Sequence, residues 1–278
     1  MKIALFSSPY IDSSEGVAVE ISRFLQKKGV EVLMKKNSES GVGQTHDIEL
    51  TNTDLIISLG GDGTLLKLIH QYGLLDIPII GINLGHLGFM AAIQITDLYS
   101  SLQDLIQGAY QSQERLMLQG RISDRKGDCF AINDIVIHRA ANPSLIEMSI
   151  YVNGTYVNTF EADGMIIATP TGSTAYSLAA GGPILAPDLE AILITPICAH
   201  TISNRPIVLA AHQEVDIEYL STQYAAEVRA DGLTHFNLNK GEIFKIKKHD
   251  KRLKLVNLNK QDPFSILRSK LGWSGKLR

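Results

Sequence analysis

The first part of the chain alternates short apolar runs with stretches of helical periodicity. Runs with the length and content of buried β-strands lie at residues 2–6, 31–34, 55–59 and 77–82. Between them, apolar residues recur at helical spacing, which predicts helices over about 17–28, 65–72 and 96–110. Such alternation is typical of a parallel sheet with helices packed on it. Residues 1–114 are therefore expected to form an α/β domain with a Rossmann-like parallel sheet.

The pattern changes near residue 115, where many short β-patterned runs begin. They lie at residues 115–122, 129–139, 145–151, 155–160, 164–168, 192–195, 207–210, 213–219, 226–230, 235–238, 242–247 and 253–257. Turn dipeptides such as Asn153-Gly154 and Asp231-Gly232 separate them. Residues 115–258 are therefore predicted to form an all-β domain, a sandwich of sheets. Residues 259–278 are expected to contain a helix that packs back on the body of the protein.

One strand of the first domain leads directly into a glycine-rich turn. Residues 60–64 read Gly-Gly-Asp-Gly-Thr, and the helix that follows is expected to stop at Gly73. Glycine lets a ligand approach the backbone closely, and the N–H groups at a helix start favour phosphate. Asp62 is the exception, because a carboxylate repels a bare phosphate. It suits a site with a metal ion or a hydroxyl that gives up a proton, although Asp-Gly is also ordinary turn chemistry.

Two further stretches place polar or flexible residues beside predicted strands. Residues 85–90, Gly-His-Leu-Gly-Phe-Met, follow the run at 77–82, and Phe89 and Met90 either cover a base or pack in the core. Asn133 and Asp134 interrupt an apolar run, and adjacent strand residues face opposite sides. Burying either side chain without a partner costs a few kcal/mol, on the order of 2 or more. Either a bulge redirects this pair, or both side chains face a polar ligand; the structural alternative is an edge strand with a local turn.

The longest unusual stretch is residues 163–183. Five hydroxyl-bearing Ser and Thr side chains fall within residues 169–177, next to an expected short helix that ends at a Gly-Gly-Pro sequence. Hydroxyls beside free helix N–H groups suit a ribose or a phosphate, and Tyr176 offers a ring that can stack on a base. The alternative is that these hydroxyls are helix caps.

Composition narrows the classes of partner. The 278 residues carry a formal net charge of −3 and two cysteines far apart, which does not favour nucleic acid, an anionic membrane or a zinc site. The basic residues at 245–254 alternate with apolar ones, as on a half-buried strand pair. No apolar run approaches the ~20 residues needed to span a bilayer, so a soluble cytoplasmic protein is expected. Phosphate-loop, dinucleotide-fold and serine-hydrolase signatures are absent, as is any histidine pair at metal spacing.

Taken together, these motifs resemble the NAD kinase family, in its bacterial ATP-NAD kinase form. The matches, in chain order, are residues 60–64, 85–89, 133–134, 163–164, 169–183, 200–206 and 267–273. Diacylglycerol, sphingosine and 6-phosphofructokinases share variants of the first motif, whereas the long Thr-Pro-Thr-Gly stretch is specific. The resemblance implies an active site between the α/β and β-rich domains.

The resemblance also implies a reaction and roles for individual residues. The γ-phosphate of ATP, or in some members polyphosphate, is transferred to the 2′-hydroxyl of the adenosine ribose of NAD, with Mg²⁺ or Mn²⁺ as the divalent ion. Asp62 would accept the hydroxyl proton. The donor phosphates would be held by Gly60, Gly61, Gly63, Thr64 and Lys67, although Lys67 is equally well explained as an exposed helix lysine. NAD would be bound by Asp62, Gly63, His86, Phe89, Asn133, Asp134, Asp163, Thr174, Ala175, Tyr176, Ser177 and Ala179. A homodimer or homotetramer is expected.

Three residues depart from the family pattern. Asp134 stands where glutamate is usual, Glu161 where a basic or bulky residue is frequent, and Leu233 where glutamine is common. These changes bear on ligand selectivity more than on the reaction. Two alternatives stay open: a lipid or sugar kinase of the same superfamily, which predicts an apolar acceptor pocket, and a non-catalytic NAD(P) sensor, which has no need of a base.

Overall fold

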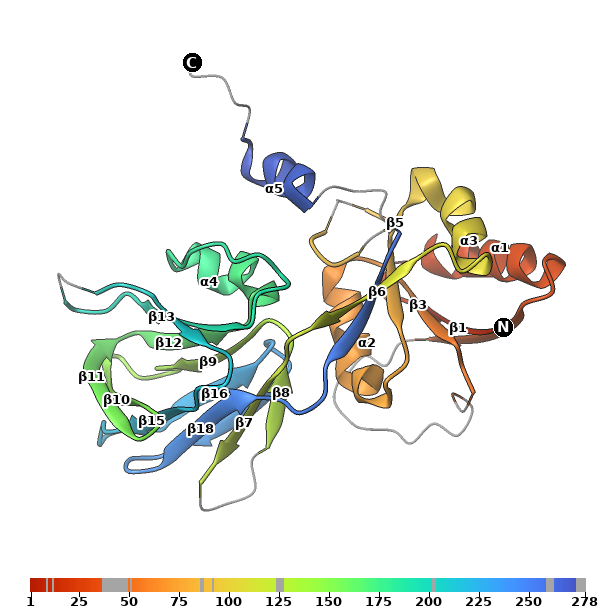
Figure 1. Cartoon of the computed structure of the whole chain (residues 1–278). Coiled ribbons are helices and arrows are strands. Elements are labelled where there is room, and N and C mark those ends of the chain that lie inside the picture. Colours follow the sequence, from red (N-terminus) through yellow and green to blue (C-terminus); the bar gives the residue numbers. More distant parts are fainter. Residues whose placement is uncertain are drawn as a thin grey trace. The chain divides into compact units, whose positions relative to one another are not determined.

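The chain forms two compact units in a computed structural model (Figure 1). Unit 1 comprises Met1–Glu114 and Leu253–Arg278, and unit 2 comprises Arg115–Arg252. The structure describes residues 1–8, 10–11, 13–36, 50, 52–85, 88–91, 93–123, 128–201, 204–258 and 263–273.

A seven-stranded, mostly parallel sheet forms the centre of unit 1. The strand order is β2-β1-β3-β4-β19-β6, and β5 pairs with β4 off this path. Every pairing that joins β1, β2, β3, β4, β5 and β19 is parallel. The bounds are β1 Lys2–Ser7, β2 Glu31–Lys36, β3 Leu55–Leu59, β4 Ile79–Asn83, β5 Ile93–Gln94, β6 Gln111–Arg115 and β19 Leu253–Asn257. The parallel α/β sheet predicted from the alternating pattern is confirmed.

Helices cover both faces of this sheet (Figure 1). Strand residues alternate between faces, so Leu5 packs in one cluster with residues of α1 (Ser13–Lys27) and α3 (Leu98–Ile106). Phe6 points the other way and meets Tyr72 of α2 (Asp62–Tyr72), with 5.1 Å between the ring centroids. The two faces together bury the apolar runs that the sequence shows.

The helix α2 ends at Tyr72 with Gly73 as its C-cap residue, as predicted, and the chain continues through a 3₁₀ turn to Asp76, whose φ is 63°. Two other details of unit 1 differ from the sequence prediction. The helix predicted over 96–110 is shorter, Leu98–Ile106, and residues 111–115 extend as β6. The strand at 253–257 was assigned to the β-rich domain, but Leu255 pairs with Ile79 of the unit 1 sheet. The sheet to which a strand belongs is decided by the strands it pairs with, and the local sequence pattern does not reveal these partners.

Unit 2 is a sandwich of two six-stranded sheets, as predicted. The pairings within both sheets are antiparallel, in the orders β11-β10-β15-β18-β7-β8 and β14-β13-β12-β9-β16-β17. Residues of both sheets form one buried cluster, among them Met148, Ile167 and Phe244. The bounds are β7 Leu118–Ile122, β8 Cys129–Ala131, β9 Asp134–His138, β10 Ile146–Val152, β11 Thr155–Ala162, β12 Gly164–Ala168, β13 Ala191–Ile197, β14 Ile207–Ala210, β15 Val215–Tyr219, β16 Ala226–Ala230, β17 Thr234–Leu238 and β18 Ile243–Lys248.

The outer face of the second sheet is also partly covered. Val136, Ile166 and Leu193 of that face form a small apolar cluster, and Ala180 and Leu185 pack against it. The covering segment contains the 3₁₀ turn η4 (Thr171–Thr174) and the short helix α4 (Tyr176–Ala179). The hydroxyl-rich stretch is thereby fixed to a rigid sheet.

The last described helix is α5 (Pro263–Leu271), which belongs to unit 1. The Lys270 ammonium lies 6.0 Å from the centroid of the Phe89 ring. Across the described residues, no helix is both long enough and apolar enough to cross a bilayer. Several cations of the basic stretch at 245–254 form ion pairs within their own units, such as Lys248 with Glu190 at 2.8 Å and Lys254 with Asp76 at 2.9 Å.

Candidate active site

The strands of unit 1 place a ligand site at the carboxyl ends of β1 and β3. These strands are neighbours, but β1 leads to β2 on one side of the sheet and β3 leads to β4 on the other. In open α/β sheets, ligands bind at such a switch point, outside the carboxyl ends of the strands. The segments that follow β1 and β3 line a cavity of about 360 Å³ there.

Most of the predicted phosphate-binding residues line this cavity. Gly61, Gly63, Thr64 and Lys67 do so, together with three residues that the sequence analysis did not select, Ser8, Tyr10 and Ile11. Gly60 is buried, does not line it, and donates its N–H to Ile82 O at 3.0 Å. The segment after β1 contains no binding motif in the sequence, so its pattern gave no signal beyond its position after a strand.

The start of α2 gives this cavity an affinity for anions. The helix begins at Asp62, and the first N–H groups of a helix have no partner within it. The partial positive charge at a helix N-terminus favours phosphate. Lys67, one turn further along, adds a full positive charge to the same cavity. The geometry therefore suits the phosphates of a nucleotide.

Asp62 holds a neighbouring backbone segment through three hydrogen bonds. Its Oδ2 accepts the N–H of Phe89 at 2.7 Å, and its Oδ1 accepts those of Met90 at 3.1 Å and Ala91 at 3.0 Å. A Cβ atom at Gly88 would lie 2.1 Å from Asp62 Oδ1, so only glycine leaves room for the carboxylate. Residues 88–91 and the glycine turn are thus one hydrogen-bonded assembly, which the sequence showed only as two separate motifs.

This arrangement limits what the Asp62 carboxylate can still do. An ionised carboxylate offers about four lone-pair positions, and three of them accept backbone N–H groups. The remaining position is on Oδ2, which accepts only one of the three hydrogen bonds. A proton or a hydroxyl group would therefore be received at Oδ2.

Unit 2 contains a second cavity, of about 450 Å³, on the outer face of the sheet with β9 and β16. Four of the predicted NAD-binding residues line it: Asn133, Asp134, Ala175 and Tyr176. The other lining residues were not predicted from the sequence; they are Val136, His138, Glu227, Arg229, Asp231 and Gly232.

Strand periodicity explains most of these missed residues. Asp134, Val136 and His138 alternate along β9 and share one face. Glu227 of β16 pairs with His138, and Arg229 lies two residues further on the same face. The Glu227 and Arg229 side chains form an ion pair at 2.8 Å. The cavity thus combines apolar groups with a few acidic and basic ones, as pockets for small ligands commonly do.

Asp231 explains how the chain passes from one sheet of unit 2 to the other. The predicted strand 129–139 is in fact two strands, β8 in one sheet and β9 in the other, with Ile132 and Asn133 between them. The Asp231 carboxylate accepts the N–H groups of Ile132 at 2.8 Å, Asn133 at 2.8 Å and Asp134 at 3.0 Å. A break between two sheets, and not a bulge, thus redirects Asn133 and Asp134. Both line the cavity, and a polar ligand facing them stays a prediction.

Asp134 is unusual among the acidic residues of this cavity. Its side chain is 6% exposed. Burial and the nearby negative charge of Asp231 raise the pKa of Asp134 from its ordinary value to about 7, against a hydrogen bond from the Tyr176 backbone that lowers it. Near neutral pH this carboxyl is partly protonated and is then able to donate a hydrogen bond as well as accept one.

The hydroxyl-rich loop uses most of its hydroxyls internally. Thr169 donates to Ile132 O and accepts the Gly172 N–H, and Ser173 donates to Pro170 O at 2.7 Å. Ser177 is fully buried and its Oγ lies 2.8 Å from Thr195 Oγ1. Its hydroxyl is therefore enclosed by protein, and a contact between Ser177 and NAD stays a prediction. The hydroxyls of Thr169, Ser173 and Ser177 thus bind within the protein, although neither η4 nor α4 has a side-chain cap hydrogen bond.

Two other predicted NAD-binding residues of this loop lie outside the cavity lining. Thr174 donates its hydroxyl to Thr171 O at 3.2 Å, and Ala179 is exposed in α4. Neither belongs to the residues that line the cavity of about 450 Å³.

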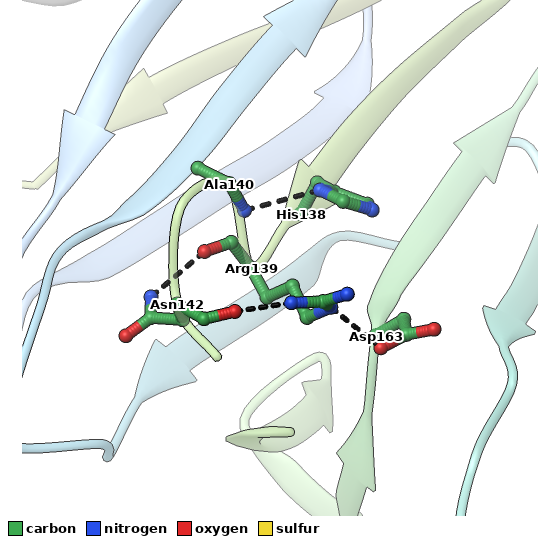
Figure 2. Close-up of polar contacts among 5 residues, drawn as sticks. All are labelled: His138, Arg139, Ala140, Asn142 and Asp163. Carbon is green, nitrogen blue, oxygen red and sulfur yellow. Dashed lines mark hydrogen bonds and ion pairs between the residues drawn. The ribbon is translucent and has the colours of Figure 1, made fainter. Parts of the chain in front are cut away.

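Asp163, another predicted contact of NAD, is held by a residue that the sequence did not indicate. Arg139 Nε lies 2.7 Å from Asp163 Oδ1, and the Arg139 N–H donates to Asp163 O at 2.9 Å. Figure 2 shows Arg139 between Asp163 and the carbonyl of Asn142, to which its guanidinium also donates. The adjacent His138 accepts the Ala140 N–H at 3.1 Å. Asp163 is therefore the neutralised end of a small polar network.

Comparisons with known proteins agree with this geometry. The ATP-NAD kinase N-terminal domain model matches residues 3–110, and the ATP-NAD kinase C-terminal domain model matches residues 132–258. The chain is 49% identical over 278 residues to the NAD kinase of Protochlamydia amoebophila, with 99% of each chain covered. It is 39% identical to the NAD kinase of Geobacter metallireducens, with 98% of each chain covered.

The chain belongs to the ATP-NAD kinase family.

Solved structures of this family share the fold. A yeast NADH kinase in complex with NADH superimposes with a TM-score of 0.87 at 26% identity, over 100% of this chain and 89% of that one. An NAD kinase from Archaeoglobus fulgidus in complex with ATP gives a TM-score of 0.79 at 26% identity, over 98% and 99%. The chain is thus a phosphotransferase of the ATP-NAD kinase family, with an α/β unit and a β-sandwich unit.

Two further residues, His86 and Phe89, were predicted to contact NAD. His86 lies outside the described residues. Phe89 offers its backbone N–H to Asp62, while its partly buried ring lies near Lys270. The part of the chain that the structure describes contains no group of three or more His, Cys, Asp or Glu residues that could hold a metal ion.

Proposed function

We propose that this member of the ATP-NAD kinase family transfers the γ-phosphate of ATP to the 2′-hydroxyl of the adenosine ribose of NAD. The products are ADP and NADP. The observation that carries the proposal is the cavity at the carboxyl ends of β1 and β3, which Gly61 and Gly63 line on either side of Asp62 at an anion-favouring helix start. Relatives named NAD kinase and a solved relative in complex with ATP support the choice of substrates.

Unit 1 holds the donor in this proposal. The N–H groups at the start of α2, the Thr64 hydroxyl and the Lys67 ammonium meet at one cavity and suit the triphosphate. The chemistry of phosphoryl transfer demands mainly positioning and charge neutralisation, which backbone N–H groups and a lysine supply. Gly60 contributes from behind the cavity, by fixing the turn to β4 through its N–H.

A divalent ion fits this site only together with the donor. Among the described residues no cluster of acidic or histidine side chains forms a complete cage. Mg²⁺ is usually held by one or two carboxylates together with substrate phosphates. Asp62 is the carboxylate of the turn, but its one remaining lone-pair position is the one proposed for the substrate hydroxyl, so the donor phosphates would supply the ligands of such an ion. When bound with ATP, such an ion would neutralise phosphate charge.

Unit 2 holds the acceptor in this proposal. Asn133 and Asp134 offer an amide and a partly protonated carboxyl at the wall of one cavity, which suits ribose hydroxyls. Tyr176, 43% exposed, offers a ring face to a base. Because Asp134 stands where the family usually has glutamate, its shorter reach is expected to change NAD affinity and not the reaction.

Asp62 is proposed as the base that accepts the proton of the attacking hydroxyl. It accepts the proton late, when the oxygen has begun to attack. The one position that remains on Oδ2 is enough for a single hydroxyl. General base catalysis contributes typically about 100-fold or more to the rate.

The first experiment incubates purified protein with ATP, Mg²⁺ and NAD and detects NADP with an NADP-specific dehydrogenase. NADP formation is expected, with a loss of about 100-fold or more in kcat for Asp62→Asn. If NADP forms with neither ATP nor polyphosphate, and NADH is not phosphorylated either, the kinase proposal is wrong. NAD binding without turnover would then favour the sensor.

A control is needed because asparagine also weakens the hydrogen bonds to residues 89–91. Gly88→Ala displaces the carboxylate from this segment without removing it, since the new Cβ would lie 2.1 Å from Oδ1. If Asp62 is the base, Asp62→Asn lowers kcat far more than Gly88→Ala at a similar loss of thermal stability. A kcat of Asp62→Asn close to that of the wild type would show that the hydrogen bonds, and not a proton acceptor, are what Asp62 provides. The oligomeric state, proposed as a homodimer or homotetramer, is tested by sedimentation equilibrium.

A further inference from the structure

The segment after β1 places a tyrosine against the lysine of the donor cavity. Lys67 Nζ lies 3.1 Å from the Tyr10 hydroxyl and 4.3 Å from the centroid of the Tyr10 ring. Both residues line the cavity of about 360 Å³ at the start of α2. The ammonium therefore donates to the hydroxyl and also lies over the face of the ring, a favourable cation–π position.

These contacts hold Lys67 without neutralising it. Within the described residues, no carboxylate lies in ion-pair distance of Lys67. Tyr10 is uncharged, so the positive charge stays available to an anion in the cavity. A lysine side chain has many rotamers and loses this freedom when it binds a phosphate. A partner that already restricts the side chain lowers that cost of binding.

The position of Tyr10 is itself fixed to the glycine turn. The Tyr10 N–H donates to Ser8 Oγ at 3.3 Å, and the Thr64 hydroxyl lies 3.5 Å from the same oxygen. Ser8 is 5% exposed, and its carbonyl accepts the Ser14 hydroxyl at 2.7 Å. The Tyr10 backbone is thus tied to α2 through a buried serine, while its side chain is 60% exposed.

We propose that Tyr10 is a positioning residue for the donor, which holds the Lys67 ammonium over the phosphate cavity. The inference rests on the proposed function, because it assigns the cavity at the start of α2 to the donor phosphates. Tyr10 acts through Lys67 and touches neither the acceptor nor the transferred group.

A double-mutant cycle with inorganic tripolyphosphate as the probe tests this directly. Its dissociation constant is measured by calorimetry for the wild type, Tyr10→Leu, Lys67→Gln and the double variant. Tyr10→Leu is expected to weaken binding about threefold to tenfold, as the loss of a hydrogen bond and a cation–π contact predicts. In the Lys67→Gln background the same change should have no further effect, because the two residues act as one unit.

Two further variants separate positioning from a general structural role. Tyr10→Phe keeps the ring and should bind tripolyphosphate with an intermediate affinity. Tyr99→Leu is the matched control, since Tyr99 is 51% exposed in α3 and packs on Phe24 at a ring distance of 5.2 Å, outside the cavity. It should bind tripolyphosphate as the wild type does. NAD affinity should be unchanged in all Tyr10 variants.

Several results would overturn the inference. They are wild-type affinity in Tyr10→Leu, multiplicative losses in the double variant, a parallel loss of NAD affinity, or no tripolyphosphate binding by the wild type. The NADP assay is scored separately. NADP formation that is insensitive to Tyr10, with unchanged tripolyphosphate affinity, refutes the inference alone. Coupled tripolyphosphate binding without NADP formation from any donor refutes the proposed function alone.

Discussion

Replacement of Asp231 by alanine tests whether one carboxylate fixes the passage between the two sheets of unit 2. Asp231 accepts three backbone N–H groups, from Ile132, Asn133 and Asp134, at 2.8 to 3.0 Å. Alanine leaves these donors without that acceptor at the break between β8 and β9. We expect unit 2 to lose stability, and Asn133 and Asp134 to lose their fixed position in the cavity.

The magnitude follows from the number and type of these bonds. A hydrogen bond to a charged group contributes roughly 1.5–3 kcal/mol, and bonds that share one acceptor are not additive. Removal of the Asp231 charge also relieves its repulsion of the Asp134 carboxylate, which offsets part of the loss. The expected net decrease in the free energy of unfolding is about 3 kcal/mol, a large share of the ~5–15 kcal/mol typical of a domain.

Urea unfolding followed by circular dichroism measures this loss. Asp231→Asn keeps one acceptor oxygen and should fall between the wild type and alanine. Asp216→Asn is the matched control, because this aspartate of the same unit forms a partly exposed ion pair with Lys245 at 3.4 Å. Its effect should stay within about 1 kcal/mol. A loss below about 1 kcal/mol in Asp231→Ala would refute the reasoning, as would an equal loss in Asp216→Asn.

Three other changes have defined outcomes. The pKa of Asp134 is raised to about 7, so between about pH 4 and 7 the native state holds a proton that the unfolded state has lost. The free energy of unfolding therefore falls as the pH rises through this range, by up to ~1.4 kcal/mol per pH unit. Asp134→Asn should flatten this slope in urea unfolding measured from pH 4 to 8; an unchanged slope contradicts the assignment. Gly172→Ala places a Cβ 1.9 Å from Asn133 O and should lower the melting temperature, as the loss of about 2 kcal/mol or more predicts. Ser177→Ala leaves the buried Thr195 hydroxyl without its partner and should lower the free energy of unfolding in urea by roughly 1–2 kcal/mol. When Thr195→Val is added to Ser177→Ala, the further loss should be smaller, because the unpaired hydroxyl is then removed as well.

Elements whose signal is local were predictable from the sequence. The strand Leu55–Leu59, the turn after it and the start of α2 follow one another within eleven residues, so apolar content and glycine position locate them. The same is true of most strands of unit 2, because alternation and turn dipeptides recur along them. Sheet membership was less predictable. Residues 253–257 have a strand pattern, but only their pairing with β4 shows that they belong to unit 1.

The motifs of the candidate site were predictable from the sequence, but the other residues that line the same cavity were not. Asn133, Asp134, Ala175 and Tyr176 were expected together and line one cavity. Arg229 of the same cavity comes from a strand more than fifty residues further along, where it reads as an ordinary exposed strand residue. Arg229 lies near the predicted residues because of the order of the strands in the sheet, and no local sequence pattern reveals that order.

Two Asp-Gly dipeptides of the chain have the same physical role at a long distance. Asp62 holds N–H groups 27 to 29 residues away, and Asp231 holds N–H groups 97 to 99 residues away. The N–H groups of irregular segments need acceptors when they are buried, and a carboxylate satisfies three at once. Asp-Gly in this chain is therefore more than local turn chemistry. At Asp62 this role constrains the catalysis, because a base that also orders residues 89–91 has only its remaining position on Oδ2 to offer to the substrate hydroxyl.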